Sequence, residues 1–315
     1  GRDRTAVCCL SSFNLEKYDE WKDDAMMIND VMRFLDNVLT DFIERAPDQF
    51  ADAKYSAARE RSVGLGVMGF HSYLQKHSIP LESVMSKVWN KKIFKHIQEH
   101  VDQASKDLAD ERGPCPDAAE YGFNERFSNK TAIAPTASIS IICGGASPGV
   151  EPVAANRYTH KTLSGSFNVR NRYLVELLEK HGKNNEDVWS GITTNQGSVS
   201  DLDFLTDHEK DVFKTAFELD QKWIIELSGD RTPHISQAQS INLFLAADVH
   251  KKELHKIHFD AWKKGLKSLY YCRSKSIQRA ENVNDEKSTD ILANVYKQKP
   301  TAAKDPEYEE CLSCQ

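Results

Sequence analysis

The sequence predicts an α/β fold, because amphipathic helical stretches alternate with short apolar segments that suit buried strands. The 315 residues are 40% hydrophobic and 28% charged, which is ordinary for a globular protein and enough for one large domain or two small ones. The alternation stops after residue 272, where polar and charged residues dominate. We therefore expect a folded part over residues 1–272 and a flexible tail over residues 273–315.

The elements follow from periodicity, taken in order along the chain. Helical stretches repeat apolar side chains every three or four residues, as Val84 and Val88 do and again Ile97 and Val101, and strands are short apolar or β-branched runs. Residues 113–130 are rich in turn formers, and Gly265 ends the last strong helix. The predicted helices cover residues 21–44, 54–61, 83–110, 209–227 and 251–264, with a marginal one near 291–296, and the strand-like segments cover 6–15, 131–142, 241–247 and 266–272.

Charge and cysteine content exclude several classes of protein. The net charge is only −6 with no run of Lys or Arg, which argues against a polymeric nucleic acid partner. No apolar run approaches the ~20 residues of a membrane span, and no signal peptide is recognisable. Seven irregularly spaced cysteines do not form a secreted disulfide framework. We therefore expect a cytoplasmic protein that does not enter a membrane.

The chain ends in a C-x-x-C dithiol, Cys311 and Cys314, placed on the polar tail. Thiol–disulfide exchange needs an accessible thiolate and a path of approach, and a tail provides both. Half of a zinc site is the alternative, but no second pair of ligands occurs at matching spacing. A flexible chain of the roughly 38 residues before Cys311 reaches about 35 Å. The pattern favours a mobile redox carrier.

Residues 64–69 match G-x-G-x-x-G, the pattern of dinucleotide-binding loops. Its context does not fit, because the preceding residues 54–61 are helical and charged and no acidic residue follows about 20 positions later. We interpret these glycines as positions of close backbone packing.

Three further segments each allow two interpretations from the residues alone. Cys8 and Cys9 form a vicinal pair in an apolar strand, where either thiol suits a buried small side chain or a redox partner for the tail. Residues 134–140 place hydroxyl side chains after a strand-like run, as in a phosphate-binding turn or an ordinary polar loop. Tyr270 and Tyr271 end a strand, where alternation would give one core and one surface ring.

Taken together, these segments resemble one family, the catalytic large subunit of class I ribonucleotide reductase. Their order and approximate spacing match the C-terminal half of that subunit, over essentially the whole chain. The matching stretches are 7–15, 61–70, 129–140, 149–152 (Gly-Val-Glu-Pro), 269–271, and Cys311 with Cys314.

The resemblance implies a fold, the second half of a ten-stranded α/β barrel with the flexible C-terminal tail. It implies that Cys8 is one of two cysteines that reduce the ribose 2′ position and become a disulfide, although the adjoining Cys9 leaves the choice of thiol open. Cys311 and Cys314 would then reduce that disulfide and be recharged by thioredoxin or glutaredoxin.

The resemblance also assigns the remaining site residues. Tyr270 and Tyr271 would stack and pass a radical equivalent inward by coupled electron and proton transfer. The loop for the substrate diphosphate would comprise Thr136, Ala137, Ser138 and Ser140.

The partners follow from the same resemblance. The radical would come from a dimetal small subunit, and this chain itself would bind no metal or cofactor. The family's Asn-x-Cys-x-Glu loop with its radical-bearing cysteine does not occur here. We therefore expect one piece of a split subunit, or a fragment, that is inactive alone. The N-terminal part would supply that loop, the second reducing cysteine and the allosteric ATP and dNTP sites.

The expected function is thus the reduction of ribonucleoside diphosphates to deoxyribonucleoside diphosphates with thiol reductants. The alternative is a non-catalytic thiol-bearing scaffold, or a thiol–disulfide oxidoreductase, that kept the fold. Tyr270, Tyr271 and the tail dithiol favour the first, because a scaffold has no use for a radical relay together with its reductant.

Overall fold

The computed structural model describes residues 3–24, 26–162 and 165–274. Of residues 160–162 and 165–167 it describes the backbone alone. Cys311, Cys314, nearly all of the predicted tail and the helix expected near 291–296 lie outside the described residues. Within the described part, no helix is long and apolar enough to cross a membrane. The strands are β1 Leu10–Asn14, β2 Gly64–Met68, β3 Arg157–Thr162, β4 Gly165–Arg170, β5 Leu243–Leu245 and β6 Cys272–Ser274. The α-helices are α1 Tyr18–Trp21, α2 Met27–Arg45, α3 Ala51–Glu60, α4 Phe70–Lys76, α5 Val84–Arg112, α6 Pro116–Glu120, α7 Ala137–Ile142, α8 Arg172–Lys180, α9 Glu186–Thr194, α10 Asp207–Val212, α11 Gln221–Arg231 and α12 Lys251–Lys263.

Five parallel segments stand side by side in the order in which they occur along the chain. β1 pairs with β2. A parallel bridge from Leu65 to Thr131 joins β2 to the third segment, and one from Ile133 to Gln239 joins the third segment to the fourth. The fourth segment continues into β5, which pairs with β6. Parallel neighbours in chain order, joined by helical connections, are the construction of an α/β barrel wall. The described part forms a wall whose two edge strands are β1 and β6.

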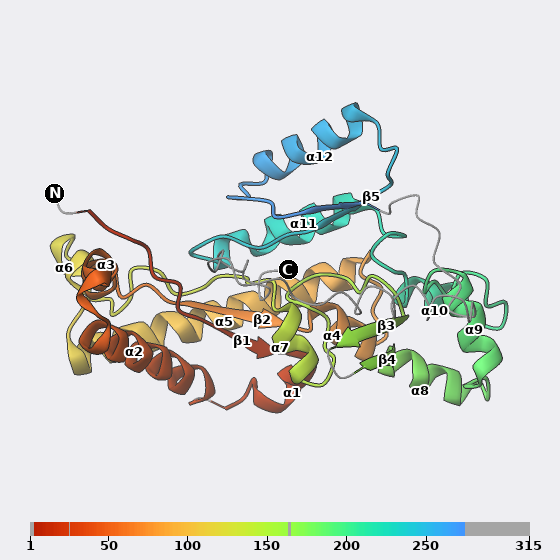
Figure 1. Cartoon of the computed structure of the whole chain (residues 1–315), viewed down its shortest axis with the longest axis horizontal. Helices are drawn as coiled ribbons and strands as arrows, with labels where there is room; N and C mark the ends of the chain where they lie inside the picture. The colour runs from red at the N-terminus through yellow and green to blue at the C-terminus, as the bar shows by residue number, and fades with distance from the viewer. Residues whose placement is uncertain (1–2, 25, 163–164, 275–315) are drawn as a thin grey trace, which may run out of the picture.

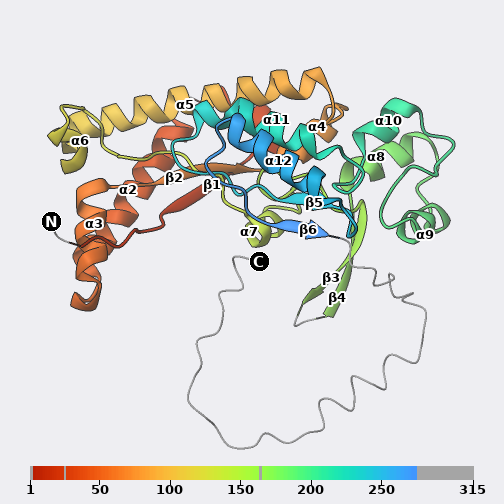
Figure 2. The same ribbon diagram turned by 90° about the horizontal axis from the view of Figure 1, so that it is seen from above.

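The two faces of this wall differ. Figure 2 shows α5 and α11 along one side of the strands and the short α7 on the other. Helix α5 packs against α2 and α11, and its buried residues, such as Phe94 and Val101, join the largest apolar cluster. A separate cluster centred on Leu174 and Trp189 supports α8, α9 and α10 at one end of the molecule (Figure 1).

Glycines let the second and third segments approach closely. A Cβ on Gly66 would lie 2.2 Å from the carbonyl oxygen of Ala132, and one on Gly64 would lie 2.9 Å from the Ala132 Cβ. Both glycines are buried within β2. The prediction that this glycine pattern serves close backbone packing is confirmed.

Most predicted elements appear with shifted ends, and three are wrong in part. The helix expected over 209–227 is two helices, because Asp220 accepts a hydrogen bond from the Lys222 N–H and starts α11 anew. The strand-like run 131–142 pairs only at Thr131 and Ile133 and then turns into α7. The segment 266–272 likewise forms ladder bonds only from Tyr270 onward.

Candidate functional site

The vicinal cysteines at the start of the first segment differ in accessibility. Cys8 is exposed, whereas Cys9 is buried and its thiol donates to the Leu35 carbonyl at 3.8 Å. Burial raises the pKa of Cys9, an effect that nearby Arg61 only partly opposes. Because the thiolate is the reactive form, burial makes Cys9 the less reactive thiol of the pair and leaves Cys8 as the accessible one. The strand's alternation thus presents one member of the pair to solvent.

The hydroxyl-rich loop follows the third segment and leads into α7. Thr136 has a φ of 55°, in the left-handed region that non-glycine residues rarely adopt. Its hydroxyl accepts the Gly149 N–H at 2.6 Å and lies 3.1 Å from the Ser140 hydroxyl. Both side chains are buried, and these bonds hold the turn in its strained conformation.

Ser138 lies in the first turn of α7 and differs both from Thr136, which precedes the helix, and from Ser140 within it. Its side chain is exposed, and Ala137 beside it is half-buried. Of the four residues predicted to contact a diphosphate, Ser138 therefore offers a hydroxyl to solvent, while Thr136 and Ser140 keep the loop in shape. The phosphate assignment itself stays a prediction.

The two tyrosines lie in contact at the start of the last segment. Their ring centroids are 4.2 Å apart with the planes inclined by 56°, so the rings touch at an angle rather than stack in parallel. Both are partly exposed, at 39% for Tyr270 and 44% for Tyr271. The alternative of one core ring and one surface ring is wrong.

A buried carboxyl and a buried amide adjoin the tyrosine strand, and neither was assigned a role from the sequence. Glu151 Oε1 accepts a hydrogen bond from Asn242 Nδ2 at 2.6 Å, and Asn242 Oδ1 accepts the Tyr271 N–H at 3.0 Å. Burial raises the pKa of Glu151 to about 7, against the opposing effects of the Asn242 hydrogen bond and the Arg273 charge. A polar residue inside the apolar run 241–247 was the available sequence clue to Asn242.

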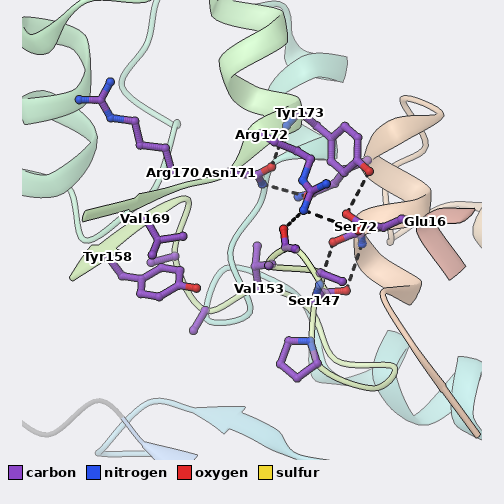
Figure 3. A pocket seen from close by; sticks show the side chains of 17 residues that line it. Glu16, Ser72, Ser147, Val153, Tyr158, Val169, Arg170, Asn171, Arg172 and Tyr173 are labelled. Carbon is purple, nitrogen blue, oxygen red and sulfur yellow. Dashed lines mark hydrogen bonds and ion pairs between the residues drawn. The ribbon is translucent and has the colours of Figure 1, made fainter. Parts of the chain in front are cut away.

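A cavity lies beside the loop that follows α7, away from the described residues predicted for the site. It has a volume of about 490 Å³ and is lined by Glu16 in the turn after β1, by α4, by the segment 144–155, by β3 and β4 and by the start of α8. Figure 3 shows that its polar side chains pair with one another: Tyr173 donates to Glu16 at 3.0 Å, and Ser72 and Ser147 exchange hydrogen bonds. Val153, Tyr158 and Val169 form an apolar wall. Of the predicted site residues that the structure describes, none lines this cavity.

Metal ligands do not gather anywhere in the described structure. Within residues 3–274, apart from the gaps noted above, no group of three or more His, Cys, Asp or Glu side chains is placed to hold an ion. His71, buried beneath the segment after α7, accepts the Val153 N–H at 3.0 Å, and burial lowers its pKa to about 3. Its role there is that of a neutral hydrogen-bond acceptor.

Comparison with known proteins gives concordant results. The family model of the ribonucleotide reductase barrel domain matches residues 2–126 and 117–272. The ribonucleoside-diphosphate reductase large subunit of Invertebrate iridescent virus 6 is 51% identical over 285 residues, which cover 89% of this chain and 30% of that protein. The putative large subunit of Frog virus 3 is 40% identical, over 99% of this chain and 53% of that protein.

A solved structure agrees with the sequence matches. The alpha subunit of the Actinobacillus ureae class Id ribonucleotide reductase superposes with a TM-score of 0.81 at 39% identity, covering 87% of this chain and 51% of that one. Across these matches the chain spans between about a third and a half of the length of its relatives.

Proposed function

This chain belongs to the ribonucleotide reductase family, and we propose that it supplies the second half of a catalytic barrel that reduces ribonucleoside diphosphates. The observation that carries the proposal is the ring contact between Tyr270 and Tyr271 at one edge of a parallel wall whose other edge begins at an exposed thiol, Cys8. The tyrosine pair can relay a radical equivalent, and the thiol can deliver the hydrogen for the reduction.

The thiol chemistry balances as follows. The ribose C2′–O bond breaks, the hydroxyl leaves as water, and hydrogen takes its place. Two thiols supply the two electrons and two protons and join as a disulfide. Cys8 is one of these thiols, since it is exposed while burial raises the pKa of Cys9. The other thiol, and the cysteine radical that opens the reaction, belong to the N-terminal part of the subunit.

The tyrosine pair carries the radical equivalent toward that cysteine. Each phenol O–H gives up an electron and a proton and regains them as the equivalent moves on. Rings in contact at 4.2 Å keep each transfer short. The small subunit supplies the radical from its dimetal centre, and this chain contributes the path.

The substrate diphosphate occupies the loop of Thr136, Ala137, Ser138 and Ser140. The exposed Ser138 hydroxyl donates to a phosphate oxygen, and a hydrogen bond to a charged group is among the stronger kinds. Thr136 and Ser140 act by keeping the strained turn in place. The tail dithiol, Cys311 with Cys314, then reduces the active-site disulfide by exchange and is itself reduced by thioredoxin or glutaredoxin in the cytosol.

The decisive experiment measures conversion of CDP to dCDP. The purified chain is combined with a radical-generating small subunit and dithiothreitol, with and without the N-terminal part of a large subunit that carries an Asn-x-Cys-x-Glu loop. We expect no product from the chain alone and turnover in the mixture, with a Tyr271→Phe chain as the matched inactive control. Product formed without the N-terminal part would contradict the need for it. A mixture that forms a stable complex and binds CDP but yields no dCDP would contradict the proposed function.

A further inference from the structure

The strand that carries the two tyrosines departs from a regular parallel ladder. The Tyr270 N–H donates to the Ile241 carbonyl at 2.9 Å, and the next bond runs from the Leu243 N–H to the Tyr271 carbonyl at 2.8 Å. In an uninterrupted parallel ladder that second bond would end on the carbonyl of Tyr270 itself. Two residues of the tyrosine strand therefore oppose one residue, Asn242, which is a β-bulge.

The bulge explains why the rings meet. Successive side chains of a regular strand point to opposite faces, which would separate Tyr270 from Tyr271. The extra residue changes the direction of one side chain, and the rings come to lie 4.2 Å apart. Regular pairing resumes directly afterwards, with Leu243 opposite Cys272. The irregularity is confined to the tyrosine pair.

A bulge leaves a backbone group without its ladder partner, and here that group is the Tyr271 N–H. The Asn242 side chain, only 1% exposed, accepts it at 3.0 Å. The bond is partly buried, and leaving this N–H unpaired there would cost free energy, so the amide stabilises the bulge. Asn242 can present its oxygen to Tyr271 only if its NH₂ group faces an acceptor, and Glu151 Oε1 is that acceptor at 2.6 Å.

Glu151 is itself held in place by the segment after α7. Its N–H donates to the Pro148 carbonyl at 2.9 Å, and its side chain is 9% exposed. The carboxyl thus connects the loop region to the tyrosine strand through a single amide. Asn242 bonds the Tyr271 N–H and Glu151 bonds Asn242, so these two residues reach the tyrosine pair at the backbone of Tyr271.

We propose that Asn242 and Glu151 are positioning residues that hold the Tyr270–Tyr271 pair in register for radical transfer by stabilising the bulge between them. The inference rests on the proposed function for its catalytic consequence. The structural part, that the amide stabilises the bulge, stands separately and has its own measurement.

The first measurement is amide hydrogen exchange in the full chain, which needs no turnover. In Asn242→Leu, the Tyr271 amide should exchange about tenfold faster or more, the change expected for loss of ~1.4 kcal/mol. The Tyr270 amide, bonded to the Ile241 carbonyl, should keep its protection. Gln239→Leu is the matched control: its buried amide bonds the Ser228 carbonyl instead and lies on the same segment. It should leave the Tyr271 amide unchanged.

The second measurement swaps the acid and the amide between positions 242 and 151 and follows turnover in the reconstituted reductase. Asn242→Asp alone sets a carboxylate against Glu151 and should lower kcat about tenfold or more with KM unchanged, since each ~1.4 kcal/mol is tenfold. Adding Glu151→Gln restores a donor facing an acceptor and should recover most of kcat. Recovery in the double variant is not expected if the residues serve folding independently of each other.

The outcomes separate the two parts of the account. A Tyr271 amide that keeps full protection in Asn242→Leu, or a double variant no better than Asn242→Asp, overturns the inference. If the Tyr271 amide of Asn242→Leu exchanges faster but the kcat of this variant is unchanged, the positioning role in radical transfer is overturned. If Asn242→Leu fails to fold, the kcat of Asn242→Asp with and without Glu151→Gln decides the question. Failure of the relay itself would appear differently, as full activity in Tyr270→Phe or Tyr271→Phe with the exchange result intact.

Discussion

Two pairs of adjacent, chemically similar residues stand at opposite edges of the parallel wall, and the structure treats them in opposite ways. Cys8 and Cys9 follow strand alternation, so one thiol is exposed and the other is buried against Leu35. Tyr270 and Tyr271 break alternation through a bulge, so both rings are partly exposed and touch. A regular strand thus selects one reactive group from a pair, whereas an irregular one makes both members available together.

The largest expected effect comes from removing either phenol. Tyr270→Phe and Tyr271→Phe should each reduce turnover of the reconstituted enzyme to background while leaving substrate affinity nearly unchanged. Phenylalanine keeps the ring packing but has no transferable proton and is much harder to oxidise. The measurement is kcat together with substrate binding, using Tyr121→Phe, which is exposed and distant in sequence, as control. If either variant retains a large share of wild-type kcat, the assignment of both tyrosines to a radical relay is contradicted.

A second test concerns the reductant of the single reactive thiol. Cys311→Ser and Cys314→Ser should stop multiple turnover with thioredoxin, because a protein reductant is too large to enter a barrel and a tethered dithiol must carry the electrons. A flexible tether raises the local thiol concentration into the millimolar range. Dithiothreitol should rescue both variants.

The contrary result for the tail is equally clear. If both tail variants stay inactive with dithiothreitol, while wild type responds to it, the tail dithiol is not a shuttle. A zinc-binding or folding role for the terminal cysteines would then take its place.

The smallest expected effect lies in the loop between the two edges. Ser138→Ala should raise the apparent substrate constant about tenfold to a hundredfold, because a hydrogen bond to a charged group contributes roughly 1.5–3 kcal/mol. Thr136→Val should act on the loop instead, lowering thermal stability as the Gly149 N–H loses its acceptor. Binding isotherms and thermal unfolding of both variants separate these effects. Unchanged binding in Ser138→Ala would place the phosphate elsewhere.

Periodicity predicted several elements that pack into the apolar clusters, the large one and the smaller one that β5 shares with α12. The helices α2, α5 and α12 and the strands β1 and β5 were all expected, because each carries apolar side chains at the spacing of its own structure. The hairpin of β3 and β4 was not expected, since sequences such as Arg157–Thr162 are largely polar and show no buried face. The break between α10 and α11 depends on local capping by Thr206 and Asp220, which periodicity does not register.

The site was predicted unevenly for similar reasons. The resemblance to ribonucleotide reductase, carried by short motifs, is confirmed by the family match, while the individual catalytic roles stay predictions. Glu151 lies in the Gly-Val-Glu-Pro stretch that carried part of the resemblance. Its hydrogen bond with Asn242 nevertheless joins positions 91 residues apart in sequence. A β-bulge stabilised by such a distant pair leaves no local pattern, so the contact between the tyrosine rings could not be derived from strand alternation.

The most direct test of the comparison is the turnover of Cys8→Ser and Cys9→Ser in the reconstituted reductase with dithiothreitol. The account predicts that Cys8→Ser is inactive and is not rescued, because the thiol that reduces the ribose is gone. Cys9→Ser should keep most of the wild-type kcat, because the Cys9 thiol is buried against the Leu35 carbonyl and takes no part. Full activity in Cys8→Ser, or loss of activity in a folded Cys9→Ser, would contradict the assignment of a single reactive thiol to this strand.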